Sequence, residues 1–228
     1  MKENKRQNTS EKGNQQTTSE DKAKSKVQEY IEVIIIAILI AVVVRTFVVQ
    51  AYKIPSQSMV PTLLVGDHLL VCKFLYGVKI PVLRRTIIPV VGPKRGDIVV
   101  FEYPMDRSKD YIKRVIGVEG DKIEIKNKQL FINDRLYPDD HAVHSDPNFY
   151  PAVVQPRDNY GPVVVPEGAL FVMGDNRDAS YDSRYWGFLD RSDITGTPWL
   201  IFYSKGIEYN KLFDTPHTRW DRIFRLAR

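Results

Sequence analysis

Twelve consecutive apolar residues, from Val33 to Val44, are the feature that most restricts how this chain can fold. They lie within a mainly apolar stretch at 30–49, and a helix of that length covers roughly 30 Å, the thickness of a bilayer's hydrocarbon core. Glu32 and Arg45 lie near its ends, where long side chains reach the interface. The stretch predicts one transmembrane helix, with a buried helix of a soluble protein as the alternative.

The segment before this stretch is polar and basic. Residues 1–26 contain almost no aliphatic or aromatic side chains, so we expect a disordered tail over 1–29. Seven Lys or Arg precede the helix, which predicts a cytoplasmic amino terminus and a main domain on the far side of the membrane. A cleavable signal peptide is the alternative, because Val49-Gln50-Ala51 has the small-residue spacing of a cleavage site, although a 30-residue leader would be long.

Beyond Tyr52 the chain consists of short β-branched and aliphatic runs separated by Gly, Pro and Asp, as at 97–101, 122–125 and 169–173. This spacing predicts a mostly antiparallel β domain. Six prolines at 133–166 indicate an irregular insert of loops and edge strands. The expected fold class is mainly β, with one N-terminal transmembrane helix and a β-rich core formed by 50–132 and 167–217.

The last segment, 218–228, shows helical periodicity. Trp220, Ile223, Phe224 and Ala227 would share one helical face, and an arginine recurs at every third position. The segment predicts a C-terminal amphipathic helix, either docked on the domain or lying on the membrane surface.

Charge and cysteine content exclude two kinds of protein. The formal net charge is +5, but no stretch alternates basic and aromatic residues on a reading element, so we expect basic surface near lipid and no nucleic-acid partner. Cys72 is the only cysteine, which rules out an intrachain disulfide and suggests a packed side chain.

Ser58 is the first candidate for chemistry. From Val49 to Ser58 the extended chain reaches at most roughly 30 Å, so Ser58 would act close to the bilayer surface. A serine hydroxyl is a weak nucleophile until a base takes its proton. None of the four histidines lies in a motif that suggests catalysis; they are His68, which we expect in a turn, and His141, His144 and His217.

Lysine is the other possible base. In a strand, Lys113 shares a face with Tyr111 and Val115 and Arg114 points the other way, so one of the two cations must face a partly apolar side. At an ordinary pKa near 10.4, about one lysine in 2,500 is neutral at pH 7. Burial that lowered the pKa to about 8 would make roughly one in ten neutral, at a cost of about 3 kcal/mol. From the residues alone, Lys113 could also be an ordinary surface lysine.

A third polar segment, 174–187, follows a predicted strand and has the Asp, Asn and Ser content of a self-capped turn. A calcium loop does not fit, because counting from Asp178 places Ser183 where Gly is needed and Leu189 where a bidentate Glu is needed. We therefore expect no metal site and no cofactor.

Together three motifs resemble the bacterial type I signal peptidases, which are membrane-bound enzymes that cut signal peptides from exported proteins. The motifs are Ser-x-Ser-Met-x-Pro-Thr-Leu at 56–63, Asp-Tyr-Ile-Lys-Arg-Val at 110–115 and the segment 174–187, in the family's order. The resemblance implies a serine endopeptidase with a Ser/Lys dyad, in which Ser58 is the nucleophile and Lys113 the general base. The Ser56 hydroxyl and the Ser58 backbone N–H would form the oxyanion hole.

The resemblance also implies supporting and substrate-binding residues. Ser180 would orient the lysine, and Asp182 and Arg184 would form an ion pair from the same face of a strand. Seven apolar residues would line shallow pockets for small substrate residues. From the sequence alone, a role in the hydrophobic core is equally open for each of them. These residues are Tyr52, Ile54, Pro55, Met59, Leu63, Tyr111 and Ile112.

The implied function is removal of signal peptides from preproteins by cleavage after small residues, at sites of the Ala-x-Ala type. The enzyme would be a single-pass protein of the cell membrane, with its catalytic β-rich core on the extracytoplasmic face, and we expect a monomer. Two other possibilities remain open: a Ser/Lys protease that cleaves only its own chain, and a membrane-anchored binding protein.

Overall fold

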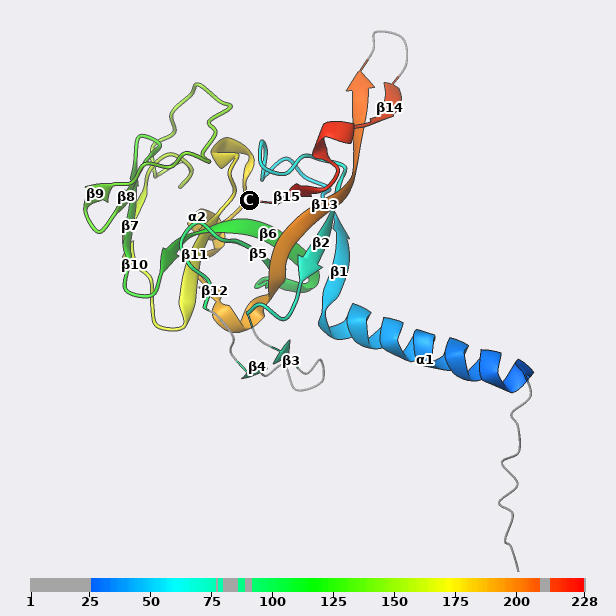
Figure 1. Cartoon of the computed structure of the whole chain (residues 1–228). Helices are drawn as coiled ribbons and strands as arrows, with labels where there is room; N and C mark the ends of the chain where they lie inside the picture. Colours follow the sequence, from blue (N-terminus) through cyan, green and yellow to red (C-terminus); the bar gives the residue numbers. More distant parts are fainter. Residues whose placement is uncertain (1–25, 77, 80–85, 89–91, 210–213, 228) are drawn as a thin grey trace, which may run out of the picture. The chain divides into compact units, whose positions relative to one another are not determined.

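The computed structural model describes residues 26–76, 78–79, 86–88, 92–209 and 214–227 (Figure 1). Most of the tail predicted at 1–29 therefore lies outside the described residues. Contacts divide the chain into one unit that ends at Ile40 and a second that begins at Ala41, and each is described by itself.

The apolar stretch forms the helix α1 (Lys26–Phe47). Its apolar side chains point in all directions around the axis and are exposed, which is unlike a helix packed in a soluble core. Of the described helices, α1 alone is long and apolar enough to cross a membrane. The predicted limits of 30–49 are shifted, because Val49 already begins the strand β1 (Val49–Lys53).

The larger sheet contains nine of the described strands in the order β1-β2-β13-β5-β6-β11-β12, with β14 and β15 also paired to β13. Its pairings are antiparallel, and the predicted mainly β fold class is confirmed. The strands after β1 are β2 (Asp67–Cys72), β5 (Ile98–Tyr103), β6 (Asp106–Val118), β11 (Ala169–Met173), β12 (Leu189–Asp190), β13 (Ile194–Tyr209), β14 (Asp214–Thr218) and β15 (Arg225–Leu226).

A second sheet has the order β10-β7-β8-β9 and lies apart from β1, β2 and β13 in Figure 1. It begins at residue 122 rather than at the predicted insert boundary of 133, and it shares a hydrophobic cluster with β11 through Ile123 and Phe171. Its strands are β7 (Lys122–Lys126), β8 (Gln129–Ile132), β9 (Arg135–Leu136) and β10 (Tyr160–Val164).

The remaining described elements are short. The strands β3 and β4 pair only with each other, and one four-residue helix and three 3₁₀ turns lie in the connections. They are β3 (Val78–Lys79), β4 (Thr86–Ile88), α2 (Ser183–Trp186), η1 (Arg177–Ala179), η2 (Arg191–Asp193) and η3 (Trp220–Arg222).

The predicted C-terminal helix at 218–228 is wrong. The segment forms the end of β14, the 3₁₀ turn η3 and the strand β15, which pairs with Leu200 and Ile201 of β13. Phe224 has a φ of +62°, which no right-handed helix allows. Arg222 is buried against Asp67, whereas Trp220 and Phe224 of the expected apolar face remain exposed. The ion pair of Arg222 with Asp67 and the pairing of β15 with β13 therefore determine the structure of this segment, in spite of its helical periodicity.

Candidate active site

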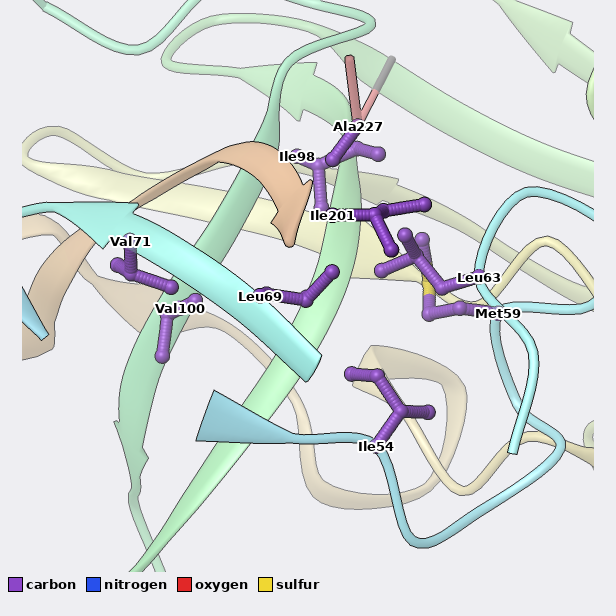
Figure 2. Packing of buried hydrophobic residues seen from close by; sticks show 9 residues of the cluster. All are labelled: Ile54, Met59, Leu63, Leu69, Val71, Ile98, Val100, Ile201 and Ala227. Carbon is purple, nitrogen blue, oxygen red and sulfur yellow. The ribbon is translucent and has the colours of Figure 1, made fainter. Parts of the chain in front are cut away.

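Ser58 lies in the loop between β1 and β2, and buried side chains anchor this loop. Met59 and Leu63 are fully buried and pack with Ile54 in a cluster shared with β2, β5 and β13 (Figure 2). Gly66 closes the loop with a φ of +91°, and a Cβ there would lie 1.9 Å from the carbonyl oxygen of Lys205. The apolar residues on both sides of Ser58 thus fix the backbone that carries it.

Lys113 meets Ser58 from the strand β6. Its Nζ donates a hydrogen bond to Ser58 Oγ at 2.7 Å, although the two residues are 55 positions apart in the chain. Both are buried, with Lys113 4% and Ser58 5% exposed. Lys113 also lies on the same side of the strand as Tyr111, whose ring centroid is 5.6 Å from Nζ. A hydroxyl and an amine are therefore held together away from water.

Burial lowers the pKa of Lys113 to about 8. The carboxylates of Asp182 and Asp175 oppose this shift, and the charge of Arg184 adds to it. Asp182 is paired with Arg184 and Asp175 with Arg114, so each carboxylate has a guanidinium at 2.7–2.8 Å. The site keeps an appreciable fraction of Lys113 neutral near neutral pH.

Both neighbouring cations of β6 are buried, which goes beyond the expectation that one of them faces an apolar side. Arg114 is 3% exposed and binds Asp175 with two nitrogens, at 2.8 and 2.7 Å. Asp175 was not predictable as the partner of Arg114 from the sequence, because it lies 61 residues away. The one sequence signal for a buried carboxylate opposite Arg114 was the position of an arginine next to a lysine inside a strand, because a buried cation needs a partner.

The polar segment after β11 holds the other side of Ser58. The backbone N–H of Asn176 donates to the Ser58 carbonyl oxygen at 3.0 Å. A Cβ on Gly174 would lie 2.4 Å from that same oxygen and 2.4 Å from Ser180 Oγ, so only glycine allows this approach. The structure thus brings together the three motifs that the sequence analysis singled out.

Two further serines lie at the site. Ser56 Oγ is 3.4 Å from Ser58 Oγ, and Ser56 is exposed. Ser180 Oγ is buried and accepts a hydrogen bond from the Gly174 N–H at 3.2 Å.

Asp182 and Arg184 form the expected ion pair, with two contacts of 2.8 Å between buried groups. They do not lie on a strand as predicted. Asp182 is the N-cap of α2 and also accepts the backbone N–H of Arg184, so the pair closes around a helix start. Burial alone would raise the pKa of Asp182, but Arg184 outweighs it and keeps the pKa below its usual value.

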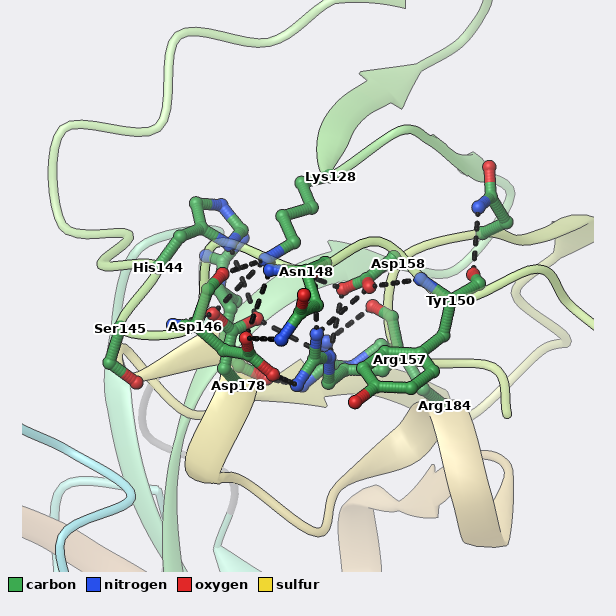
Figure 3. A network of polar contacts seen from close by, with 12 residues as sticks. Lys128, His144, Ser145, Asp146, Asn148, Tyr150, Arg157, Asp158, Asp178 and Arg184 are labelled. Carbon is green, nitrogen blue, oxygen red and sulfur yellow. Dashed lines mark hydrogen bonds and ion pairs between the residues drawn. The ribbon is translucent and has the colours of Figure 1, made fainter. Parts of the chain in front are cut away.

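A network of ion pairs and hydrogen bonds joins the insert to this segment (Figure 3). Arg157 binds Asp158 at 2.9 Å and Asp146 at 2.8 Å, and Lys128 binds Asp178 at 3.2 Å. Arg184 Nη1 donates to the Arg157 carbonyl oxygen at 2.8 Å. The insert is therefore docked against the site through polar contacts that its proline-rich sequence did not predict.

The candidate substrate-binding residues separate into two groups. Ile54, Met59 and Leu63 are buried in the hydrophobic cluster, which gives these side chains a core role. Tyr52 and Ile112 pack against that cluster while partly exposed, and Tyr52 donates to Asp110 at 3.1 Å. Tyr111 is also partly exposed and Pro55 is exposed.

The described histidines lie in other surroundings. His68 is on β2 rather than in the expected turn and contacts the rings of Phe202 and Tyr203. His144 Nδ1 lies 3.5 Å from Asp178. Among the described residues, no group of three or more His, Cys, Asp or Glu could hold a metal ion.

Comparison with known proteins relates this geometry to a family. Residues 27–203 match the family described as signal peptidase, peptidase S26. The signal peptidase I of Pseudomonas aeruginosa strain PAO1 is 39% identical over 192 residues, which cover 71% of this chain and 67% of that protein. The signal peptidase I of Buchnera aphidicola subsp. Acyrthosiphon pisum is 31% identical over an alignment of 245 positions. The alignment covers 82% of this chain and 76% of that protein.

A solved signal peptidase I from Enterococcus faecalis V583 is 30% identical, with a TM-score of 0.39, and its alignment covers 47% of this chain and 97% of that one. The sequence matches and the β-rich fold define the class of protein, a peptidase. The chain belongs to the signal peptidase family, peptidase S26.

Proposed function

We propose that this protein is a membrane-bound serine endopeptidase that removes N-terminal signal peptides from exported preproteins. In this proposal it cuts after small residues, at sites of the Ala-x-Ala type, through an acyl-enzyme on Ser58. The observation that carries the proposal is the 2.7 Å contact between Ser58 Oγ and the buried Lys113 Nζ.

The chemistry starts from neutral Lys113. Its amine takes the Ser58 proton as Oγ attacks the substrate carbonyl carbon, and the carbonyl oxygen becomes an oxyanion. The Lys113 ammonium then protonates the leaving amine as the peptide bond breaks, which leaves an ester on Ser58. In the second half Lys113 takes a proton from water, the hydroxide attacks the ester, and the returned proton restores the Ser58 hydroxyl.

The neighbouring groups support this reaction. The Ser56 hydroxyl, 3.4 Å from Ser58 Oγ, and the Ser58 backbone N–H would stabilise the oxyanion. Ser180 would help to orient Lys113, and the ion pair of Asp182 with Arg184 would hold the segment 174–187 rigid.

Substrate contacts are proposed for residues beside the dyad. Tyr52, Tyr111 and Ile112 are partly exposed and Pro55 is exposed, so their side chains can contact a peptide directly. The buried Ile54, Met59 and Leu63 would act from behind, by shaping the floor of shallow pockets. Small pockets would favour the small side chains of an Ala-x-Ala site.

Membrane anchoring follows from α1, whose length and composition suit one span. We propose a cytoplasmic amino terminus, because residues 1–26 hold seven Lys or Arg ahead of the apolar run, and a catalytic domain on the extracytoplasmic face. A signal peptide in the bilayer would then present its cleavage site near Ser58. The proposal requires no cofactor and assumes a monomer, with the bilayer and the preprotein as partners.

The test is cleavage of a purified precursor with an Ala-x-Ala site by the full-length protein in detergent or lipid. We expect cut precursor with the wild type and a loss of about 10⁴-fold or more with Ser58→Ala. Lys113→Arg should be equally inactive, because its guanidinium stays protonated. Appreciable turnover by either variant would overturn the dyad.

The same assay separates the alternatives. A protease that cleaves only its own chain would leave the added precursor intact. A membrane-anchored binding protein would leave the precursor uncut in all three cases, with the wild type and with both variants.

A further inference from the structure

Thr62 lies four residues after Ser58 in the same loop and contacts Asp175, Arg222 and Arg114, which come from three distant parts of the chain. Its hydroxyl donates to Asp175 Oδ2 at 2.5 Å. Its carbonyl oxygen accepts from Arg222 Nη2 at 2.9 Å. Thr62 is therefore held both through its side chain and through its backbone.

The partner Asp175 is the point where the other two parts of the site meet. It is fully buried, and its second oxygen accepts from Arg114 Nε at 2.8 Å. Arg114 follows Lys113 in β6. Asp175 also precedes Asn176, whose N–H binds the Ser58 carbonyl oxygen at 3.0 Å.

These contacts close two circuits around the reacting atoms. One runs from Ser58 along the loop to Thr62, across to Asp175 and back through Asn176 to the Ser58 carbonyl. The other runs from Thr62 through Asp175 and Arg114 to Lys113, whose Nζ reaches Ser58 Oγ. The Thr62 hydroxyl is the link that both circuits share.

We propose that Thr62 is a positioning residue, whose hydroxyl fixes the loop of Ser58 relative to the strand of Lys113. The inference rests on the proposed Ser58 and Lys113 chemistry, which it deepens. Thr62 touches neither the substrate nor the exchanged proton. It sets the distance over which that proton passes, and a shift of about 1 Å in such a distance can cost about 100-fold in rate.

The test compares Thr62→Ala with Thr62→Ser, which differ only by the hydroxyl, in the precursor assay with the full-length protein. We expect Thr62→Ala to lower kcat by about 10-fold to 100-fold with KM changed less than about twofold. Thr62→Ser should recover most of the loss. Thr62→Val, close in shape to threonine, should resemble Thr62→Ala if it folds.

Thr197→Ala is the matched control. It also removes a threonine hydroxyl bond, to the Ile98 carbonyl oxygen at 2.8 Å, but away from Ser58, and it should keep the wild-type kcat. Wild-type kcat in Thr62→Ala would overturn the inference. Equal losses in Thr62→Ala and Thr62→Ser would also overturn it, because the methyl group would then be responsible.

Failure of the underlying function has a different signature. If Ser58→Ala still cleaves the precursor, the proposed function fails and the positioning role fails with it. If Ser58→Ala is inactive and Thr62→Ala is fully active, only the positioning role is lost.

Discussion

At the scale of single residues, the buried cations Lys113 and Arg114 are accommodated in different ways. Both are buried cations of one strand, but Arg114 has a carboxylate partner, whereas Lys113 contacts a neutral hydroxyl and has its pKa lowered to about 8. The 110–115 motif predicted the lysine's role through family resemblance. The sequence did not reveal its burial, because the groups that cover Lys113 come from segments far along the chain.

The lowered pKa predicts the pH dependence of activity. Because the proposed reaction needs neutral Lys113, kcat/KM should rise about tenfold per pH unit below pH 8 and level off above it. The measurement is the rate of precursor cleavage from pH 6 to pH 10 in one detergent. A rate that stays constant between pH 6 and pH 9 would contradict this assignment of the base.

The same burial predicts a stability effect with a defined sign. Between pH 8 and 10.5 the unfolded chain binds more protons at Lys113 than the folded one, so the cost of burial is complete below pH 8 and vanishes above 10.5. Lys113→Met should therefore be inactive but more stable at pH 7, by up to about 3 kcal/mol. Denaturant unfolding at pH 7 measures this gain, and Lys113→Arg, which keeps the buried charge, should lack it.

At the scale of elements, short β-branched and aliphatic runs predicted strands well, and β5, β7 and β11 lie where expected. The C-terminal segment was mispredicted because its periodic apolar residues do not form the buried face. Ala227 is buried, but Arg222 is equally buried beside Asp67. Burial would raise the pKa of Asp67, yet its hydrogen bonds to Arg222 and Ser204 hold the pKa below the usual value.

This contact makes the C-terminal segment a stabilising element. Arg222→Ala would remove the nearer of the two guanidinium groups beside the fully buried Asp67 carboxylate, leaving Arg219 at 3.7 Å, and should destabilise the fold by about 3 kcal/mol. Arg225→Ala removes an exposed arginine from the same segment and is the matched control, with an expected change within about 0.5 kcal/mol. Chemical denaturation of the two variants measures the difference, and equal stabilities would refute the role of the pair.

At the scale of the whole molecule, the apolar run at 33–44 predicted α1 directly, since no other element needs so long an apolar stretch. The division of the described strands between the two larger sheets was not predictable in the same way. The sequence suggested an irregular insert of loops and edge strands on the core, whereas β7 and β10 share a hydrophobic cluster with β11, and Arg157 of the insert pairs with Asp178 beside the site. Such long-range ion pairs leave no local pattern.

The proposed topology can be tested with single cysteines in a Cys72→Ala background. Val153 is 94% exposed in the insert, and Ser19 precedes α1. In intact cells, a membrane-impermeant maleimide should label Val153→Cys from outside and should label Ser19→Cys only after the membrane is opened. Labelling of Ser19→Cys in intact cells would reverse the proposed orientation.

Burial of Lys113 also means that its protonation state differs between the unfolded and the folded chain. In an unfolded chain the lysine keeps a pKa near 10.5, so almost every copy is protonated at neutral pH. The neutral amine arises only after β6 is covered and the segment following β11 has closed around Ser58. In the proposed mechanism, a newly translocated chain is therefore latent until it folds, and this latency spares it self-digestion.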